Sequence, residues 1–330
     1  MRFASVLFAA GGGERLRPLT AAVPKPALPL LDVPLGAFGL TALSRDAPPV
    51  VVNLSHLAGA VRAALAPFAP ADRVGFLDEG AEPYGTGATL VALGERLGER
   101  VLTWSADVLT GLAPATLLEA HRASGAPATV AVRRVDRGAD LALDGTTVRG
   151  FIDRRREPER SGAQFLNPAV FESEALHLLP SGRPLGLAEG LLRPLAERGA
   201  LRALVFDGYW IDAGTPARYL RAALDLLDGA LEPPGGAWPG TIIETAGGHA
   251  YLGPGARAEA GSLGPGAVLL RGCEVEAGAR LRRCVVGPGE RVPGGAALGD
   301  AIFWGGRALD VSPAERPPRT EPSSKRPQGP

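Results

Sequence analysis

The segment FASVLFAAGGGERLRPLT (residues 3–20) decides how the first part of the chain folds. It opens with a short apolar run that is typical of a buried strand, and this run ends at three consecutive glycines. Glycines at the end of a strand let backbone amides converge on an anion, and a helix that started there would add its dipole. The segment therefore predicts a phosphate cradle directly after the first strand.

The spacing of these glycines argues against two common nucleotide-binding loops. Gly11 and Gly13 are followed by Leu16, where a dinucleotide-binding fold carries its third glycine. Asn53 stands where the second strand of such a fold would end in an acidic residue. The Gly-Lys-Ser or Gly-Lys-Thr of a P-loop is also missing from the segment. A hydride-transferring dehydrogenase is therefore a poor interpretation.

Apolar runs of strand length alternate with helical patterns from residue 2 to about residue 230. Such alternation predicts an α/β fold, Rossmann-like, with a mixed, mostly parallel sheet covered by helices. The composition then becomes rich in proline and glycine at EPPGGAWPG, residues 232–240, as in a linker. We therefore expect a first domain at residues 1–231.

Beyond the linker, aliphatic residues recur at steps that are mostly of six residues and twice of five. Glycine-bearing turns follow these positions, as the corners of hexapeptide repeats require. The pattern predicts a left-handed parallel β-helix over residues 241–309, although the two short steps depart from a perfect coil. The segment 310–330 has many prolines and no periodicity, so we expect it to be disordered.

Composition excludes several kinds of partner. The 35 basic and 35 acidic residues balance, so no overall field would attract nucleic acid or an anionic membrane. No stretch approaches the roughly 18 apolar residues of a membrane span, and the N-terminal apolar run is too short for a secretory signal. We expect a cytoplasmic protein. Its two cysteines lack metal-ligand spacing, which favours buried free thiols.

Lysine is rare in this chain. Lys25 and Lys325 are its only lysines, against 33 arginines. Because nearly all other basic residues of the chain are arginines, the lysine in the PKP tripeptide indicates a position that needs a compact point charge. Lys25 is therefore a candidate functional residue.

The string G-G-G-x-R-L-x-P-L-T at residues 11–20, followed by P-K-P at 24–26, resembles the signature of the sugar-1-phosphate nucleotidylyltransferases. In that family the segment wraps the triphosphate. The resemblance implies that Arg15 lies against the outgoing phosphates and Lys25 near the transferring phosphoryl centre. It also implies a nucleotide-binding backbone at Ala10, Gly11, Gly12 and Gly13.

Two further strings extend the resemblance over essentially the first 225 residues. VVNLSHL (51–57) and EPYGTGATLVAL (82–93) look like segments of the mannose-1-phosphate guanylyltransferase branch. There the second string faces the base and the sugar, although an ordinary turn before a helix would also account for its GTG. The resemblance implies nucleotide binding by Glu82, Gly85, Thr86 and Gly87.

Two aspartates form a candidate metal site. Asp107 in WSADVL ends an apolar run, and Asp212 in GYWIDAGTPARYL (208–220) lies in a turn before a helical pattern. Two carboxylates from distant strand ends are what a Mg²⁺ ion shared with substrate phosphates requires. Each alone could be a capping or turn residue, but both flanks match the metal-binding strings of the family. The prediction is a Mg²⁺ cofactor held by Asp107 and Asp212.

The sugar side departs from the family pattern. Many relatives carry an E-K-P segment whose lysine holds the sugar phosphate, but residues 150–171 here contain no lysine. Arg154 or a neighbouring arginine could replace it, or the phosphate is held otherwise, as in N-acetylmuramate-1-phosphate uridylyltransferases. Asn167 matches the sugar-contacting strand. Glu189 lies in a helical pattern and either lines the sugar pocket or is a solvated charge.

The resemblance implies transfer of a nucleotidyl group from a nucleoside triphosphate to a sugar 1-phosphate, with GTP and mannose 1-phosphate as leading substrates. UTP or dTTP with glucose 1-phosphate, or UTP with N-acetylmuramate 1-phosphate, stays open. So does a non-catalytic regulatory paralogue that binds a sugar nucleotide. Acyl transfer is less well supported, because the repeats carry a single histidine, His249. The β-helix could also pair subunits into a homo-oligomer.

Overall fold

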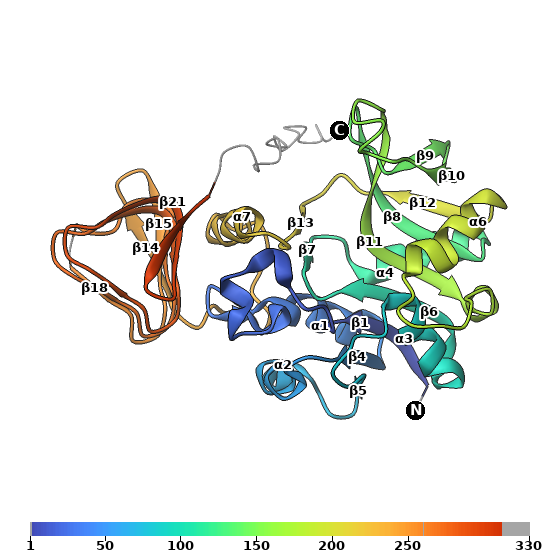
Figure 1. Ribbon diagram of the computed structural model, residues 1–330, viewed down its shortest axis with the longest axis horizontal. Coiled ribbons are helices and arrows are strands. Elements are labelled where there is room, and N and C mark those ends of the chain that lie inside the picture. Colours follow the sequence, from blue (N-terminus) through green and yellow to red (C-terminus); the bar gives the residue numbers. More distant parts are fainter. Residues whose placement is uncertain (1, 260, 312–330) are drawn as a thin grey trace, which may run out of the picture.

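The computed structural model describes residues 2–259 and 261–311. Figure 1 shows a large sheet with helices at one end of the molecule, a column of stacked strands at the other, and α7 between them. Residues 312–330, nearly all of the segment expected to be disordered, lie outside the described residues.

The apolar runs of the first 205 residues form a nine-stranded sheet in the described chain, in the order β5-β4-β1-β6-β11-β8-β12-β10-β9. Its strands are β1 (Phe3–Phe8), β4 (Val50–Leu54), β5 (Val74–Asp78), β6 (Leu97–Ser105), β8 (Ala128–Val135), β9 (Leu141–Asp144), β10 (Thr147–Phe151), β11 (Gly162–Glu172) and β12 (Leu201–Val205).

The sheet is mixed, as expected, but parallel pairing dominates only in its first part. Strands β5, β4, β1 and β6 pair in parallel, as do β8 and β12. Strand β11 runs antiparallel to both β6 and β8, and β10 is antiparallel to β9 and β12. The short turn between β9 and β10 can join only antiparallel strands, which explains that pair.

Helices cover both faces of the sheet. Successive residues of β1 point to opposite faces, so Leu7 joins one apolar cluster with Leu40 of α1, while Val6 joins a second cluster with Leu90 of α3. None of the helices in the described ranges has the length and apolar character needed to cross a membrane. The helices are α1 (Leu35–Asp46), α2 (Ala58–Leu65), α3 (Thr86–Leu93), α4 (Pro114–Ser124), α5 (Ser173–Leu176), α6 (Arg193–Glu197) and α7 (Pro216–Leu227).

The glycine segment after β1 does not lead into an α-helix, contrary to the possibility raised by its sequence. Three single 3₁₀ turns follow instead: η1 (Glu14–Leu16), η2 (Leu19–Ala21) and η3 (Lys25–Ala27). Prolines at 18, 24 and 26 remove the backbone donors that a continuous helix would need. No α-helix dipole therefore adds to this loop.

The second part of the chain forms stacked strands in two sheets. One has the order β14-β15-β17-β19-β21-β22 and the other the order β16-β18-β20. Strand β22 reaches Asp310, the first residue of the segment expected to be disordered. The strands are β14 (Thr241–Thr245), β15 (Gly248–Leu252), β16 (Arg257–Ala258), β17 (Ala267–Leu269), β18 (Glu274–Val275), β19 (Arg280–Val286), β20 (Arg291–Val292), β21 (Ala297–Trp304) and β22 (Arg307–Asp310).

These strands repeat with a period of 17 residues. Tyr251 pairs with Val268, and Val268 with Val285, in parallel register. Each such turn of chain contains two steps of six residues and one of five, so the short steps noted in the sequence recur once per turn. Glycines at 255, 272 and 289 have positive φ at the same corner of successive turns, a conformation that favours glycine.

The stacked strands share apolar contacts with the first part of the chain. Tyr251, Val268 and Leu270 belong to the same buried cluster as Leu30 and Leu31. A separate cluster fills the interior of the stack and includes Cys273 and Cys284, which are buried free thiols, as expected. The repeats therefore pack directly onto the first part of the chain.

Candidate active site

A cavity of about 310 Å³ opens where strands β1, β4 and β6 end. In open α/β sheets ligands bind at this edge, outside the carboxyl ends of parallel strands. The lining combines the glycine segment, the PKP tripeptide and the GTG loop. It consists of Phe8, Ala9, Ala10, Gly11, Lys25, Pro26, Asn53, Glu79, Pro83, Gly85, Thr86, Ser105, Ala106, Asp107 and Pro184.

The glycine segment has open backbone, and its first glycine, Gly11, lines this cavity. Gly11 and Gly12 are exposed, and no atom would meet a Cβ added at either one. Gly13 differs, because it has φ 64° and a Cβ there would lie 3.1 Å from the Cβ of Lys25. The hydroxyl of Thr20 also donates a hydrogen bond of 2.8 Å to the Gly13 carbonyl. The loop thus folds back onto Lys25.

Lys25 and Asp107 form an ion pair at the cavity. The Lys25 ammonium donates a hydrogen bond to Oδ2 of Asp107, and the two side chains are only 13% and 20% exposed. Lys25 comes from η3 and Asp107 from the turn between β6 and β7 (Val108–Thr110). Two of the residues predicted from the sequence are therefore in direct contact.

A short antiparallel pair brings Asp212 to the same place. Strand β13 (Trp210–Asp212) pairs with β7, so that Asp212 lies opposite Val108. The amide of Ala213 donates a hydrogen bond of 2.9 Å to the carbonyl of Asp107. Oδ2 of Asp212 accepts from the Arg218 guanidinium at 3.1 Å, whereas its Oδ1 is buried without a hydrogen-bond partner.

The two aspartates differ in their proton affinity. Burial raises the pKa of Asp212 above its ordinary value, and the neighbouring Asp107 carboxylate raises it further, against the nearby cations of Lys25, Arg218 and Arg15. Burial also acts to raise the pKa of Asp107, but the Lys25 ammonium, together with hydrogen bonds from Ser105 and the backbone, holds that pKa below its usual range. The two carboxylates therefore lie close enough for the charge of one to act on the other, while each is also paired with a cation.

The donor set is compatible with Mg²⁺. This ion prefers oxygen ligands and is commonly held by one or two carboxylates, with waters and substrate phosphates completing its shell. The unpartnered, buried Oδ1 of Asp212 is a free oxygen ligand beside Asp107. Within the described ranges no group of three or more His, Cys, Asp or Glu side chains offers a different metal site.

Arg15 lies beside Asp212, which, unlike Asp107, is not part of the cavity lining. Its Nη2 is 3.1 Å from the position that a Cβ on Gly214 would occupy, next to Oδ1 of Asp212. The side chain is exposed, and the residue is not part of the cavity lining. Arg15 can therefore reach an anion placed outside the two aspartates.

The GTG loop contributes two of its four predicted residues to the cavity, Gly85 and Thr86. Thr86 also accepts a hydrogen bond of 2.9 Å from the amide of Leu187, which ties the loop to the segment after Pro184. Gly87 is buried, and its amide donates to the carbonyl of Leu185 at 2.9 Å. Glu82 is exposed and outside the lining.

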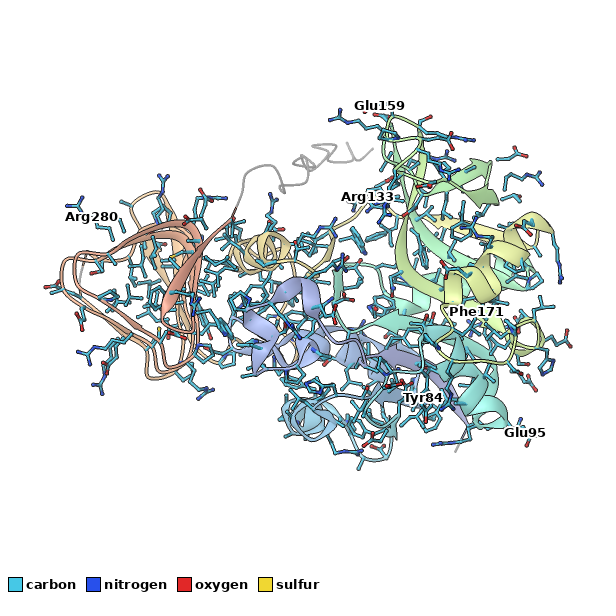
Figure 2. The ribbon with its side chains drawn as sticks, viewed as in Figure 1. Tyr84, Glu95, Arg133, Glu159, Phe171 and Arg280 are labelled. Atoms are coloured by element: carbon cyan, nitrogen blue, oxygen red, sulfur yellow. The ribbon has the colours of Figure 1, made fainter. Side chains whose placement is uncertain are left out.

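Tyr84 lies beside this loop, on the side of the sheet far from Arg280 and the stacked strands (Figure 2). The guanidinium of Arg183 stacks over its ring, 3.2 Å from the ring centroid. A cation on an aromatic face is favourable, so this contact joins the loop to the segment that includes Pro184. Both segments border the cavity.

A buried polar network lies in the floor of the cavity, and sequence reasoning missed it. Glu79 accepts hydrogen bonds from the Asn53 amide at 2.9 Å and the Thr89 hydroxyl at 2.6 Å. Its other oxygen accepts from the amide of Tyr84 at 2.8 Å, and Asn53 accepts from the amide of Ala9 at 2.7 Å. The only visible signal was an asparagine within the apolar run VVVNL.

The residues predicted for the sugar side are dispersed. Asn167, at the irregularity of β11, has φ 88°, and its buried Oδ1 has no hydrogen-bond partner, so it could serve a ligand. Arg154 pairs with Asp140 instead, and Glu189 is exposed in the π-helical turn Ala188–Leu192. None of Asn167, Arg154 and Glu189 lines the cavity.

Comparison with known proteins gives the family. A model of the nucleotidyl transferase family matches residues 4–229, which is more than half of the chain. The chain belongs to the nucleotidyl transferase family. This confirms the resemblance to the sugar-1-phosphate nucleotidylyltransferases and the implied enzyme class, a nucleotidyltransferase.

Named relatives of this nucleotidyl transferase cover most of both chains. It is 28% identical over 309 residues to mannose-1-phosphate guanylyltransferase of Mycobacterium tuberculosis, covering 89% of this chain and 82% of the relative. It is 27% identical over 318 residues to mannose-1-phosphate guanylyltransferase 1 of Arabidopsis thaliana, covering 91% of this chain and 85% of the relative. The fold is similar to HddC from Yersinia pseudotuberculosis, with a TM-score of 0.56 and 20% identity over 68% of this chain and 99% of HddC.

Proposed function

We propose that this nucleotidyl transferase joins GTP to mannose 1-phosphate, giving GDP-mannose and pyrophosphate. The observation that carries the proposal is the cluster of Lys25, Asp107 and Asp212 beside the open backbone of Gly11 and Gly12. The names of the relatives in Mycobacterium and Arabidopsis support the choice of guanine and mannose.

The reaction forms one bond and breaks one at the α-phosphorus of GTP. An oxygen of the sugar phosphate attacks that phosphorus in line, while the bond to the bridging oxygen of the β-phosphate breaks and pyrophosphate leaves. The attacking oxygen is already anionic, so no general base is needed. Catalysis then consists of positioning two anionic reactants and neutralising the charge that gathers at phosphorus.

The chain's own residues meet this demand in the proposal. Backbone amides of Gly11, Gly12 and Gly13 hold the β and γ phosphates, and Arg15 neutralises them as they leave. Lys25 brings a compact positive charge to the phosphorus, since its ammonium is already fixed at Asp107 on the cavity wall. The loop of Gly85 and Thr86 holds the base and ribose.

Asp107 and Asp212 would hold Mg²⁺ in this proposal. When bound, the ion would supply positive charge to the phosphate oxygens and help to orient them. The free Oδ1 of Asp212 supports this role. Arg218 fixes the other oxygen of that carboxylate, which limits its rotation.

The sugar phosphate is proposed to enter beside Asn167. This residue has strained backbone and an unsatisfied buried oxygen, and such features are frequent in binding sites. Arg154 and Glu189 remain weaker proposals, because Arg154 is paired with Asp140 and Glu189 is exposed. Another arginine could therefore take the place of the lysine that the E-K-P segment of relatives supplies.

The proposed architecture of the chain has two domains. A catalytic domain at residues 1–231 is followed by a linker at 232–240 and a left-handed parallel β-helix at 241–309. The parallel 17-residue register and the recurring corner glycines support the β-helix. The outer strands of its stack are candidates for contacts in a homo-oligomer.

Pyrophosphate release tests the proposed function. The purified chain would be assayed with Mg²⁺ across GTP, UTP, dTTP and ATP, each with mannose, glucose and N-acetylmuramate 1-phosphate. A signal for GTP with mannose 1-phosphate alone supports the full proposal. A signal for another pair keeps the reaction and replaces the substrates. Silence from folded protein that still binds a sugar nucleotide indicates a regulatory paralogue.

A further inference from the structure

The PKP tripeptide is followed at once by a tight hairpin that lies against the stacked strands. The hairpin consists of β2 (Pro29–Leu30) and β3 (Val33–Pro34), joined by Leu31 and Asp32. The turn η3 that carries Lys25 leads directly into β2. The position of Lys25 is therefore linked to that of the hairpin through only a few residues.

The hairpin turn holds Leu31 in a conformation that leucine disfavours. Leu31 and Asp32 both have positive φ, 47° and 61°. Two-residue hairpins of this kind normally carry asparagine and glycine at these places, because a leucine side chain crowds the backbone there. Such backbone persists only when its surroundings hold it, so contacts outside the hairpin must stabilise this turn.

Those contacts come from the repeat region. The hydroxyl of Tyr251 in β15 is within 3.0 Å of both the Leu31 carbonyl and Oδ2 of Asp32. Oδ1 of Asp32 accepts a hydrogen bond of 2.9 Å from the amide of Arg271, which belongs to the next turn of the stack. Gly253 has no side chain at the point where the carboxylate enters, and a Cβ there would overlap it.

The hairpin and the Lys25 turn are also joined to each other. The amide of Leu28 donates to the carbonyl of Lys25 at 3.1 Å, and the amide of Leu35 donates to the carbonyl of Leu28 at 2.9 Å. Tyr219 of α7 donates a hydrogen bond to the carbonyl of Pro29 on the same hairpin. The segment from Lys25 to Leu35 is thus one hydrogen-bonded unit with the repeats on its far side.

From these contacts we infer that Asp32 is a positioning residue: together with Tyr251 it lets the repeat region hold the hairpin, and thereby the Lys25 ammonium, in place at Asp107. The repeats are then part of the catalytic apparatus without touching the substrate. This inference rests on the proposed function for its kinetic consequence. Its structural consequence, the fixing of Lys25, can be measured without any turnover.

The chain offers a direct probe of Lys25, because Lys325 is its only other lysine. Acetylation by an N-hydroxysuccinimide ester, followed by peptide mass spectrometry, gives the reaction rate of Lys25 with Lys325 as internal reference. The full chain and its variants Asp32→Ala, Asp32→Asn and Tyr251→Phe would be compared. Glu276→Ala is the matched control, because Glu276 also accepts from one side chain, that of Arg291, and from one backbone amide, that of Gly294, but inside the repeats.

Asp32→Ala is expected to raise the acetylation rate of Lys25 several-fold and to lower kcat about tenfold, with KM near the wild-type value, because a displaced catalytic group affects the transition state most. For Asp32→Asn, the acetylation rate and kcat should lie between those of the wild type and of Asp32→Ala, because its amide oxygen can still accept from the Arg271 amide. Glu276→Ala should match the wild type in both. If Asp32→Ala fails to fold, Tyr251→Phe decides by the same two measurements.

Two results separate the inference from the proposed function. Folded Asp32→Ala and Tyr251→Phe proteins whose Lys25 reacts no faster than in Glu276→Ala would overturn the inference, whatever their kcat. A second result would support the positioning role and reject the proposed function: Lys25 is acetylated faster in the Asp32→Ala and Tyr251→Phe variants, but the wild-type chain turns over no substrate pair.

Discussion

The ammonium of Lys25 is hydrogen-bonded to the carboxylate of Asp107, 82 residues away in the chain. Each group removes part of the cost of burying the other's charge. The contact also keeps a positive charge at the cavity beside a negative pair, Asp107 and Asp212. A nucleotide phosphate would meet cations and carboxylates in fixed positions.

Replacing Lys25 by arginine should lower kcat at least about tenfold, because a planar guanidinium cannot take the place of a compact ammonium against both a carboxylate and a phosphorus centre. Lys325→Arg, which changes the only other lysine, should keep the wild-type kcat. Steady-state pyrophosphate release measures both. Equal kcat values for the two variants would remove Lys25 from the mechanism.

Replacing Asp107 or Asp212 by asparagine should lower kcat at least about a hundredfold, because the variant loses one negative charge from the proposed metal site and an ion pair with it. The fold should persist, as judged by circular dichroism. Asp144→Asn is the control, since Asp144 is an exposed partner of Arg149 far from the cavity. A near-normal rate for Asp107→Asn would contradict the assignment.

Removal of divalent ions should abolish turnover. With EDTA in excess the rate is expected to fall to background and to return when Mg²⁺ is added, because without the ion the carboxylates of Asp107 and Asp212 would repel the phosphate oxygens. The Mg²⁺ concentration for half-maximal rate should rise in Asp212→Asn if any activity is left. Full activity in EDTA would show that Asp107 and Asp212 do not serve a metal.

Glu79→Ala should destabilise the fold. The variant removes the acceptor of the Tyr84 amide and one acceptor each from Asn53 and Thr89, which keep hydrogen bonds to Thr89 and Gly85. An unsatisfied buried group costs about 1–3 kcal/mol, so we expect a loss of about 2 kcal/mol in the free energy of unfolding. Urea denaturation followed by tryptophan fluorescence measures it. Exposed Glu82→Ala, three residues along, should change little.

His121 should make stability depend on pH. It is buried between Thr129 and Glu172, and burial lowers its pKa below the usual value, although Glu172 acts the other way. The unfolded chain takes up a proton near pH 6.5, whereas the folded chain does so only at lower pH, so its stability is lost as pH falls below about 6.5.

His121→Gln should therefore show a shallower loss of stability between pH 7.5 and 5.5 than the wild type, by up to about 1.4 kcal/mol per pH unit. The exposed His177→Gln variant should keep the wild-type slope. Urea midpoints across this pH range measure the slopes. The same slope in both variants would mean that His121 is not the group that titrates.

Short sequence strings predicted those parts of the candidate site that each lie within a single segment of the chain. The glycines after the first strand, Lys25 and the two aspartates stand in strings whose backbone and charge requirements are visible in sequence, and Lys25 and Asp107 do meet. The alternation of apolar runs likewise predicted the sheet, and the stacked strands found beyond residue 240 are compatible with the predicted β-helix, which stays a prediction. The antiparallel part of the sheet was underestimated, because strand direction depends on connection geometry.

Other features depend on contacts between distant segments and leave no sequence pattern. Glu79 looks like any loop carboxylate until β5 pairs with β4 and places it against Asn53. Asp32 looks like an ordinary turn residue until Tyr251 and Arg271 surround it. Arg154 was a reasonable candidate by charge, but its pairing with Asp140 is decided by the tertiary fold.

The most direct test follows the phosphorus atoms of GTP. The full chain would be incubated with Mg²⁺, mannose 1-phosphate and GTP labelled with ³²P at either the α or the γ position, and the products separated by chromatography. The account predicts that the α label appears in GDP-mannose and the γ label in pyrophosphate, and that Lys25→Gln and Asp107→Asn proteins form both products far more slowly than the wild type. Release of the γ label as inorganic phosphate, or failure of the α label to enter a sugar nucleotide with any sugar 1-phosphate, would contradict it.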